Sequence, residues 1–365
     1  MTSQTPIRCL VFRGGTSKGL YFHAGDLPND IATRDKVLLA AMGAPDVREI
    51  DGMGGGHPLT SKVAVIKKSL RDDADVDYLF LQIWPDRAEV SDNQNCGNLL
   101  AGVGPFALEE GLLDAGETTS EVRIWMENTQ SLAVAHIATP GGAVRYEGDA
   151  HIDGVPGTSS SIPIEFLDIA GSTSGSLLPT NHAIDIVNGL RVTCIDNGMP
   201  VVCVRADDLG LTGYEEPHDI EANEEVCQRV EELRLAAGPL MNLGDVTKKS
   251  VPKVSLLAPA KNGGVIATRT FIPHRVHEAI GVLGAVSVAT ACLVPGSVAQ
   301  EVAGITTDAS RATLDVEHPT GYFSVSLVVS IEDGDVLVQS AALVRTARLL
   351  MRGEVLVPSS IWAGR

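Results

Sequence analysis

The sequence has no hydrophobic run long enough to span a membrane. Apolar residues make up 44% of the 365-residue chain, but no stretch approaches the roughly eighteen consecutive apolar residues that a transmembrane helix needs. Residues 1–8 also lack the basic and apolar regions of a signal peptide. We therefore expect a soluble cytoplasmic protein that does not act at a membrane.

Paired cysteines are also missing. The six cysteines are scattered, with no C-x-x-C pair and no grouping with histidine at the spacing of metal ligands. This pattern predicts free thiols rather than disulfides, and it suggests no metal site. Whether a given cysteine is reactive or only packs in the core must therefore be inferred from the residues around it.

Positive charge is scarce. Lys and Arg number 28 against 46 Asp and Glu, which gives a formal net charge of -18. Such a chain repels nucleic acid and anionic membrane surfaces, so we expect neither as a partner. It would also repel an acidic substrate at long range, which local lysines, arginines and helix N-termini would then have to bind.

Two common catalytic signatures are absent. No G-x-S-x-G segment supports a serine hydrolase. The glycine-rich segment at residues 13–19 lacks the G-x-x-x-x-G-K-[ST] order of a phosphate loop and leads into a strand-like stretch, so we reject nucleotide binding. Two interpretations remain: a turn between two strands, or a carboxylate-binding loop formed by Thr16, Ser17 and Lys18.

Cys96 is the most informative residue that is present. It lies in the polar run 92–98, which leads directly into the apolar stretch 99–113. The pattern predicts a helix with a thiol at its N-terminus, where unpaired N–H groups help the thiol to lose its proton. The alternative is a small apolar side chain that merely packs. The neighbouring Asn and Gly residues favour the functional interpretation.

Lys62 is the second candidate. It follows the glycine-rich segment 52–56 and opens the apolar stretch 62–66, which predicts a buried strand. Burial there would favour the neutral amine that a general base needs. The alternative is a lysine that extends from the strand end into solvent.

The length of the chain, its loop-like segments and a match between its two halves predict two domains and an internal duplication. A chain of 365 residues exceeds what one core usually serves. Loop-like segments at 153–161 and 170–176 mark the approach to a domain boundary, after which a second series of predicted strands and helices begins. Residues 61–65 of the first half match residues 252–256 of the second. We expect domains at 1–184 and 185–345, with 346–365 returning to the first.

We predict strands at 8–12, 20–22, 62–66, 78–83, 122–126, 131–136, 190–195, 201–204 and 254–257, and helices at 33–42, 99–110, 221–237 and 276–291.

The predicted helices at 99–110 and 276–291 carry Gly and Ala where an exposed helix would carry charge. Small residues allow strands to wrap closely round a helix that is apolar on every side. We therefore expect two sheets, each enclosing a central helix. If both helix N-termini faced the interdomain cleft, they would form a pocket for a carboxylate-rich ligand.

The second half has no cysteine at the entrance to its central helix. Arg275 and His277 lie just ahead of the Gly281 and Gly284 positions of the predicted helix, at the place that Cys96 occupies in the first half. They are interpreted either as a carboxylate clamp or as capping residues.

Six segments together resemble the PrpF family, which includes 2-methylaconitate isomerases, methylitaconate isomerases and 4-oxalomesaconate tautomerases. They are residues 13–19, 54–62, 95–98, 196–200, 318–321 and 345–348. The resemblance implies the diaminopimelate-epimerase-like α/β fold, with two pseudo-equivalent domains and the active site between them. It also implies proton transfer without a cofactor, in which Lys62 and Cys96 do the acid and base work. The substrate-binding positions that we expect with them are Thr16, Ser17, Lys18, His57, Ser61, Asn95, Gly97, Asn98, Asn197, Met199, Arg275, His318 and Thr320.

The reaction implied by this resemblance is a 1,3-allylic proton shift in an unsaturated tricarboxylate. Lys62 would remove a proton to give a dienolate, and Cys96 would return one at the far carbon. Residues 6–15 and 196–200 look more like the tautomerase branch, which favours 4-oxalomesaconate. The alternatives are a 2-methylaconitate or aconitate isomerase, or a relative that binds polycarboxylates without turnover. The sequence leaves the direction of reaction, the assignment of acid and base, and a homodimeric state open.

Overall fold

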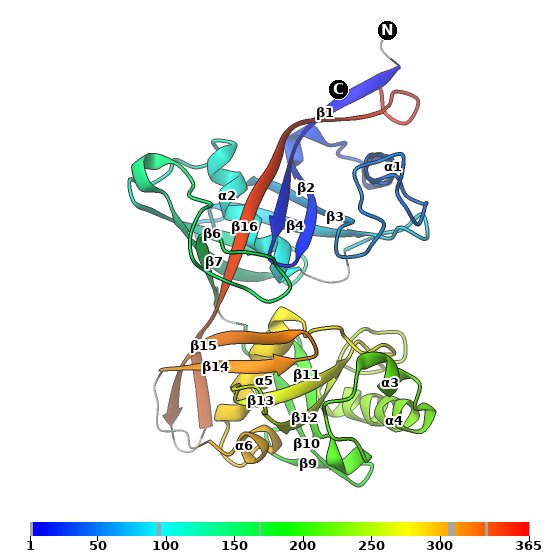
Figure 1. The fold of residues 1–365 in the computed structure, drawn as a ribbon, viewed down its shortest axis with the longest axis vertical. Helices are drawn as coiled ribbons and strands as arrows, with labels where there is room; N and C mark the ends of the chain where they lie inside the picture. The colour runs from blue at the N-terminus through cyan, green and yellow to red at the C-terminus, as the bar shows by residue number, and fades with distance from the viewer. Residues whose placement is uncertain (1–2, 93–95, 168, 306–310, 333–334, 365) are drawn as a thin grey trace. The chain divides into compact units, whose positions relative to one another are not determined.

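The computed structural model describes residues 3–92, 96–167, 169–305, 311–332 and 335–364. The chain forms two compact units, one made of residues 1–165 with 344–365 (unit 1) and one of residues 166–343 (unit 2) (Figure 1). The division falls earlier than the expected 184/185 boundary. The loop 170–176 belongs with unit 2 because Asp196 Oδ2 accepts hydrogen bonds from the N–H groups of Thr173 and Ser174, at 2.9 and 2.8 Å.

Unit 1 is built mainly of strands. Its elements are β1 (Gln4–Gly14), β2 (Ser17–His23), η1 (Ala24–Asp26), α1 (Ile31–Met42), β3 (Lys62–Lys68), β4 (Val76–Ile83), β5 (Val90–Ser91), α2 (Gly97–Glu109), β6 (Thr119–Met126), β7 (Ser131–Ala138), η2 (Pro140–Gly142) and most of β8 (Ser161–Leu167). The end of β16 (Asp335–Pro358) completes it by pairing with β1.

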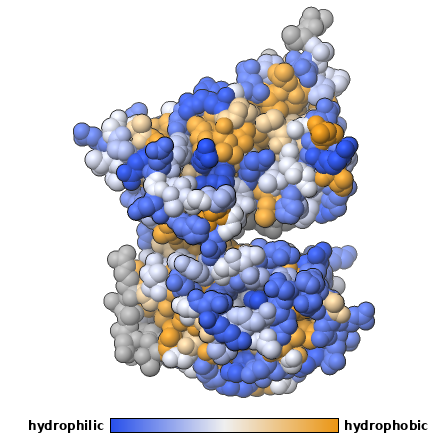
Figure 2. Space-filling view, viewed as in Figure 1, coloured by the Kyte–Doolittle hydropathy of each residue, from blue (hydrophilic) through white to orange (hydrophobic). Residues whose placement is uncertain are grey.

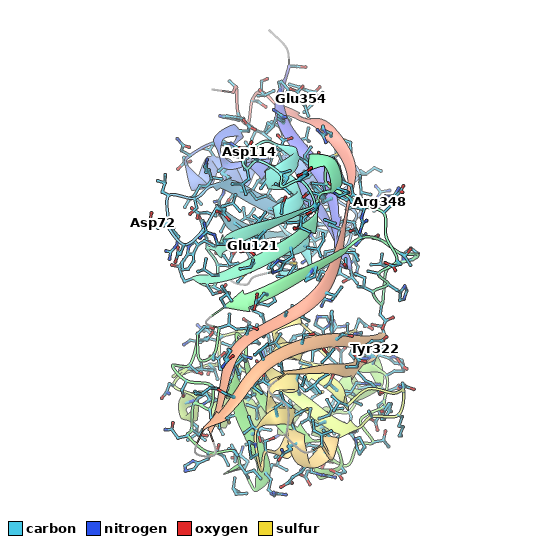
Figure 3. The ribbon with its side chains drawn as sticks, turned by 90° about the vertical axis from the view of Figure 1, so that its left-hand side faces the viewer. Asp72, Asp114, Glu121, Tyr322, Arg348 and Glu354 are labelled. Atoms are coloured by element: carbon cyan, nitrogen blue, oxygen red, sulfur yellow. The ribbon has the colours of Figure 1, made fainter. Side chains whose placement is uncertain are left out.

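Unit 2 has the same character. Its elements are β9 (Asp185–Val187), β10 (Leu190–Asp196), β11 (Pro200–Arg205), η3 (Asp207–Leu209), α3 (Pro217–Glu221), α4 (Glu224–Leu240), β12 (Lys253–Pro259), β13 (Ile266–Phe271), α5 (Val282–Leu293), α6 (Val298–Ala303), β14 (Arg311–His318), β15 (Gly321–Glu332) and the start of β16. Figure 3 shows β16 as one continuous strand that carries Arg348 and Glu354 in its unit 1 portion.

The two units repeat one topology. In unit 1, β2 is parallel to β3, β3 antiparallel to β4, β4 parallel to β6 and β6 antiparallel to β7. In unit 2, β11 to β15 pair in the same alternation. α1 and α4 precede β3 and β12, and α2 and α5 precede β6 and β14. The duplication inferred from residues 61–65 and 252–256 is therefore present, with Lys62 and Lys253 each opening the equivalent strand.

Strand alternation gives the unit 1 sheet two buried faces. One face packs Leu20, Phe22, Val63 and neighbouring residues against α1. The opposite face, which we call the α2 face, packs against α2, whose residues 99–107 are all buried. Strands β1, β2, β3, β4, β6, β7, β8 and β16 form a hydrogen-bonded series that returns from β16 to β1. The series encloses α2, which contacts six of its strands.

The central helix of unit 2 begins later than the sequence predicted. α5 is buried throughout but starts at Val282, with Gly281 as its N-cap, instead of at residue 276. The intervening residues are held in other structure: Val276 forms a β-bridge with Phe271, and His277 Nδ1 accepts the N–H of Ala279 at 2.9 Å. The position equivalent to Cys96 is therefore Gly281, and Arg275 lies well before the helix.

None of the helices in the described part of the chain has the length and hydrophobicity needed to cross a bilayer. The view in Figure 2 shows polar residues over most of the surface of each unit, with apolar residues gathered in separate patches.

Two buried helix glycines provide a test of the enclosure of α2. A Cβ atom on Gly102 would lie 2.5 Å from the hydroxyl of Tyr21, whereas the nearest atom to a Cβ on Gly284 of α5 would be 3.7 Å away. We expect Gly102→Ala to destabilise the protein by about 1–3 kcal/mol through overpacking. Gly284→Ala should be neutral or stabilising by up to about 1 kcal/mol because Ala is the better helix former. Urea unfolding of both variants measures this, and equal effects would contradict the enclosure.

Candidate active site

Cys96 is the N-cap of α2, as the polar run before the helix predicted. Its backbone is extended (φ -127°, ψ 96°), and its side chain makes no capping hydrogen bond to the helix. The residue is buried, with 8% of its surface exposed. The thiol therefore lies at the end of the helix where unpaired N–H groups create a partial positive charge.

Two tyrosines of the α2 face fix the first turn of this helix. Tyr78 in β4 donates its hydroxyl hydrogen to the carbonyl of Cys96 at 3.3 Å, and Tyr21 in β2 donates to the carbonyl of Leu99 at 2.6 Å. Burial raises the pKa of both phenols well above the usual value, and the nearby Cys96 raises it further. Both tyrosines therefore remain neutral donors at any physiological pH.

Lys62 opens β3 and is buried, with 7% of its surface exposed. Its Nζ atom donates to Oε1 of Gln82 at 2.7 Å and lies 4.9 Å from the centre of the Phe80 ring. Lys62 therefore does not extend from the strand end into solvent. Among the described residues, no carboxylate forms an ion pair with it.

Lys62 and the helix N-terminus share the α2 face. Lys62 is paired with Gln82 across β3 and β4, and Tyr78, Phe80 and Gln82 alternate along one side of β4. Residues two apart in a strand are separated by about 7 Å. Tyr78, which bonds to Cys96, is therefore followed along the same side of β4 by Phe80 and Gln82, which contact Lys62. Gly19 of β2 lies between Lys62 and the first turn of α2. A Cβ atom at Gly19 would be 2.4 Å from the carbonyl oxygen of Lys62 and 3.1 Å from the side chain of Leu99.

The glycine-rich segment 13–19 is a hairpin turn between β1 and β2, and it packs against the start of α2. Gly14 pairs with Ser17 across the turn. Asn98 Nδ2 donates to Thr16 Oγ1 at 3.1 Å, and a Cβ atom on Gly15 would lie 2.2 Å from Asn98 Oδ1. The structure thus has the turn between two strands, and the turn places Thr16 against Asn98 at the start of α2.

Two buried oxygens at this turn have no hydrogen-bond partner among the residues that the structure describes. They are Oγ of Ser17, which is 2% exposed, and Oδ1 of Asn98. An unsatisfied buried polar atom costs free energy, which a ligand with complementary groups would recover. Thr16 thus contacts Asn98 in the first turn of α2, which follows Cys96 and Gly97, and Ser17 belongs to the same β1–β2 turn, while Asn95 lies outside the described residues.

Three expected binding residues of unit 1 point elsewhere. Lys18 alternates with Ser17 and shares the face of Leu20 and Phe22. His57 is exposed, and its Nδ1 accepts the N–H of Leu59 at 3.1 Å. Ser61 is fully buried, and its hydroxyl donates to Glu49 Oε2, which also accepts the N–H of Gly56.

The expected residues of unit 2 around Asn197 and His318 contact their own unit. Asn197 Nδ2 donates to Thr290 Oγ1 of α5 at 2.8 Å, and the carbonyl of Met199 accepts from Ser287 at 2.7 Å. His318 ends β14, and its Nδ1 accepts the N–H of Thr320 at 3.3 Å.

Arg275 does not lie at the entrance of α5. Its side chain is 75% exposed, and its Nε atom lies 2.8 Å from Oε1 of Glu221 in an ion pair. Glu221 also accepts the N–H of Val276 at 2.8 Å. The guanidinium group thus fastens the segment before α5 to α3, and it does not cap α5, whose N-cap is Gly281.

Sequence reasoning missed three residues that build this site. Tyr21 and Tyr78 hold the helix, and Gln82 holds Lys62. It also missed Glu49, which holds Ser61 away from the site. The only sequence signal was a glutamine within the otherwise apolar stretch 78–83. Its importance depends on the register between β3 and β4, which the sequence does not reveal.

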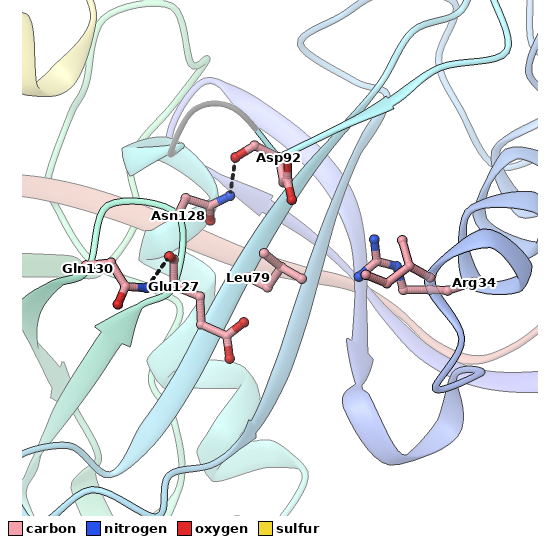
Figure 4. Close-up of a pocket in the computed structure, with 7 residues that line it drawn as sticks. Arg34, Leu79, Asp92, Glu127, Asn128 and Gln130 are labelled. Carbon is pink, nitrogen blue, oxygen red and sulfur yellow. Dashed lines mark hydrogen bonds between the residues drawn. The ribbon is translucent and has the colours of Figure 1, made fainter. Parts of the chain in front are cut away.

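A cavity of about 560 Å³ lies on the other side of β4 (Figure 4). It is lined by Leu79, which alternates with Phe80 and so faces away from Lys62, and by charged and amide side chains. Asn128 Nδ2 donates to the carbonyl of Asp92 at 2.8 Å across it. None of the predicted site residues that the structure describes lines this cavity. The part of the chain that the structure describes also shows no group of three or more His, Cys, Asp or Glu residues placed to hold a metal ion.

Comparison with known proteins identifies the family. The model of the family described as PrpF protein matches residues 4–358. A (4E)-oxalomesaconate Delta-isomerase from Novosphingobium sp. is 60% identical, over 96% of this chain and 97% of that protein. A 4-oxalomesaconate tautomerase from Pseudomonas putida is 55% identical, over 99% of each. A crystal structure of methylitaconate-delta-isomerase superimposes with a TM-score of 0.86 at 33% identity, covering 100% of this chain and 98% of that one.

The chain therefore belongs to the PrpF family, and it is an isomerase. The predicted diaminopimelate-epimerase-like α/β fold is confirmed.

The placement of Arg275 gives a prediction. Because its guanidinium group is paired with Glu221 and exposed, Arg275→Ala should change KM for the substrate less than twofold and leave the melting temperature nearly unchanged. Steady-state kinetics and thermal melting measure the two quantities. A tenfold rise in KM would contradict this prediction and support the interpretation of Arg275 as a carboxylate-binding residue.

Proposed function

We propose that this member of the PrpF family catalyses a 1,3-allylic proton shift in an unsaturated tricarboxylate without a cofactor, with Lys62 and Cys96 as the proton-transfer pair. The observation that carries the proposal is their placement. A buried amine and a thiol at a helix N-terminus lie on one face of one sheet, linked through β4 and Gly19.

The neutral amine of Lys62 takes the base role in this mechanism. It removes a proton from the carbon next to an electron-withdrawing carbonyl or unsaturated carboxylate, and the electron pair of the C–H bond passes into a dienolate. Cys96 then gives its proton to the far carbon of the allylic system, which places the double bond in its new position. The cycle closes when the proton held by Lys62 passes to the thiolate.

The start of α2 supplies groups for the developing negative charge. We assign this role to the N–H groups of its first turn, which follow Cys96, and to the hydroxyl of Ser17 and the amide of Asn98 at the adjoining β1–β2 turn. Groups held in place before the reaction stabilise a dienolate better than mobile water does. The net charge of -18 makes such local groups necessary for an anionic substrate.

Among tricarboxylates we favour 4-oxalomesaconate. The relatives with 60% and 55% identity are named for it, while the solved structure with 33% identity is named for methylitaconate. Residues 6–15 and 196–200 support the same choice. A metabolite of this kind fits the cytoplasmic location inferred from the sequence.

The pair can be tested by two substitutions. Lys62→Ala and Cys96→Ser should each lower kcat by about 10²-fold or more, because each removes a general acid or base. The matched controls are Lys253→Ala, at the equivalent strand start of unit 2, and Cys227→Ser in α4, and both should keep full turnover. Full turnover in both site variants would refute the mechanism.

The substrate is decided by offering each acid separately. The ultraviolet change on mixing protein with 4-oxalomesaconate, 2-methylaconitate or methylitaconate reports movement of the double bond. We expect 4-oxalomesaconate to give the highest kcat/KM. Rapid conversion of 2-methylaconitate with inert 4-oxalomesaconate would contradict this choice. In D₂O a protein that only binds the acid would leave its C–H bonds unlabelled.

A further inference from the structure

Gln82 is a buried polar residue whose side chain ends at Lys62. It lies in β4, is 2% exposed, and is paired with Lys62 in the β3–β4 register. Its Oε1 atom accepts a hydrogen bond from Lys62 Nζ at 2.7 Å. No family motif used in the sequence analysis includes it.

The surroundings of Gln82 allow only one orientation of its amide. Nε2 lies 3.0 Å from the carbonyl oxygen of Pro58, 3.1 Å from that of Ser61 and 3.0 Å from that of Ile83. All three are acceptors, so the NH₂ group must face them. Rotating the amide would place Oε1 against three oxygens and the NH₂ group against the Lys62 amine. Oε1 is therefore held towards Lys62.

The acceptor at this position is neutral. A carboxylate there would stabilise the ammonium form of Lys62 and oppose its action as a base, whereas an apolar residue would leave the amine without a fixed direction. A backbone-anchored amide gives the amine a fixed direction without placing a full negative charge beside it. The same anchoring ties Gln82 to residues 58–61, at the end of the glycine-rich loop.

We propose that Gln82 is a positioning residue, which aims the Lys62 amine and keeps it able to release its proton during turnover. This inference rests on the proposed role of Lys62 as the base. The competing explanation is that Gln82 only fastens the 58–61 segment to β4. Loss of that fastening would lower stability without changing how the rate depends on pH.

Two substitutions should shift the pH profile in opposite directions. Gln82→Glu puts a negative charge beside the amine, so the rising limb of kcat/KM against pH should move to higher pH by about one unit. Gln82→Met removes the acceptor and keeps the volume, so the limb should move to lower pH while kcat falls about tenfold or more. KM should change less than threefold in both. Gln228→Met, on the exposed side of α4, is the control and should change none of these.

Thermal melting at each pH establishes that the variants are folded. If one of them fails to fold, the other still has a stated direction of shift. Limbs that stay at the wild-type pH in the folded variants would overturn the inference, as would a shift of both in the same direction.

Lys62→Ala in the same assay separates this inference from the proposed function. If Lys62→Ala keeps its turnover, the proposed base is wrong. If Lys62→Ala is inactive while the Gln82 variants keep the wild-type profile, only the role of Gln82 is wrong.

Discussion

The enclosure of α2 by the strands of unit 1 is the constraint on which the site depends. A helix buried on every side cannot shift without breaking the packing of residues 99–107. The hydroxyls of Tyr21 and Tyr78 add fixed hydrogen bonds to the carbonyls of Leu99 and Cys96. The thiol and the N–H groups at the start of the helix are therefore held in place before any substrate binds.

The second consequence of the enclosure is that a lysine can be buried beside the helix. Lys62 stands at the start of β3, where strand alternation turns it towards the α2 face. Its amine is satisfied by the neutral oxygen of Gln82, which is itself held by three backbone carbonyls. The arrangement places a titratable amine and a thiol on one face of the sheet, and no carboxylate among the described residues forms an ion pair with that amine, which suits acid–base catalysis on an anionic substrate.

The sequence predicted those parts of the site that depend on local order. A polar run before an apolar stretch located the N-terminus of α2 within two residues of Leu99. The match between residues 61–65 and 252–256 located two equivalent strand starts. It could not reveal partners set by register, so Gln82 and Tyr78 were missed. It also mislocated the start of α5, because the Phe271–Val276 bridge competes with the helix and depends on contacts made after folding. Arg275 was interpreted without its ion-pair partner Glu221, which lies 54 positions earlier in the chain.

The central claim is that the Lys62 amine and the side chain at position 96 act on the same small acid. The most direct test is a crystal structure of the Cys96→Ser variant with bound 4-oxalomesaconate. The account predicts that Lys62 Nζ and the hydroxyl at position 96 both contact the allylic carbons of one ligand, at about 3–3.5 Å. A ligand that touches only one of the two side chains, with the other facing a separate cavity, would contradict it.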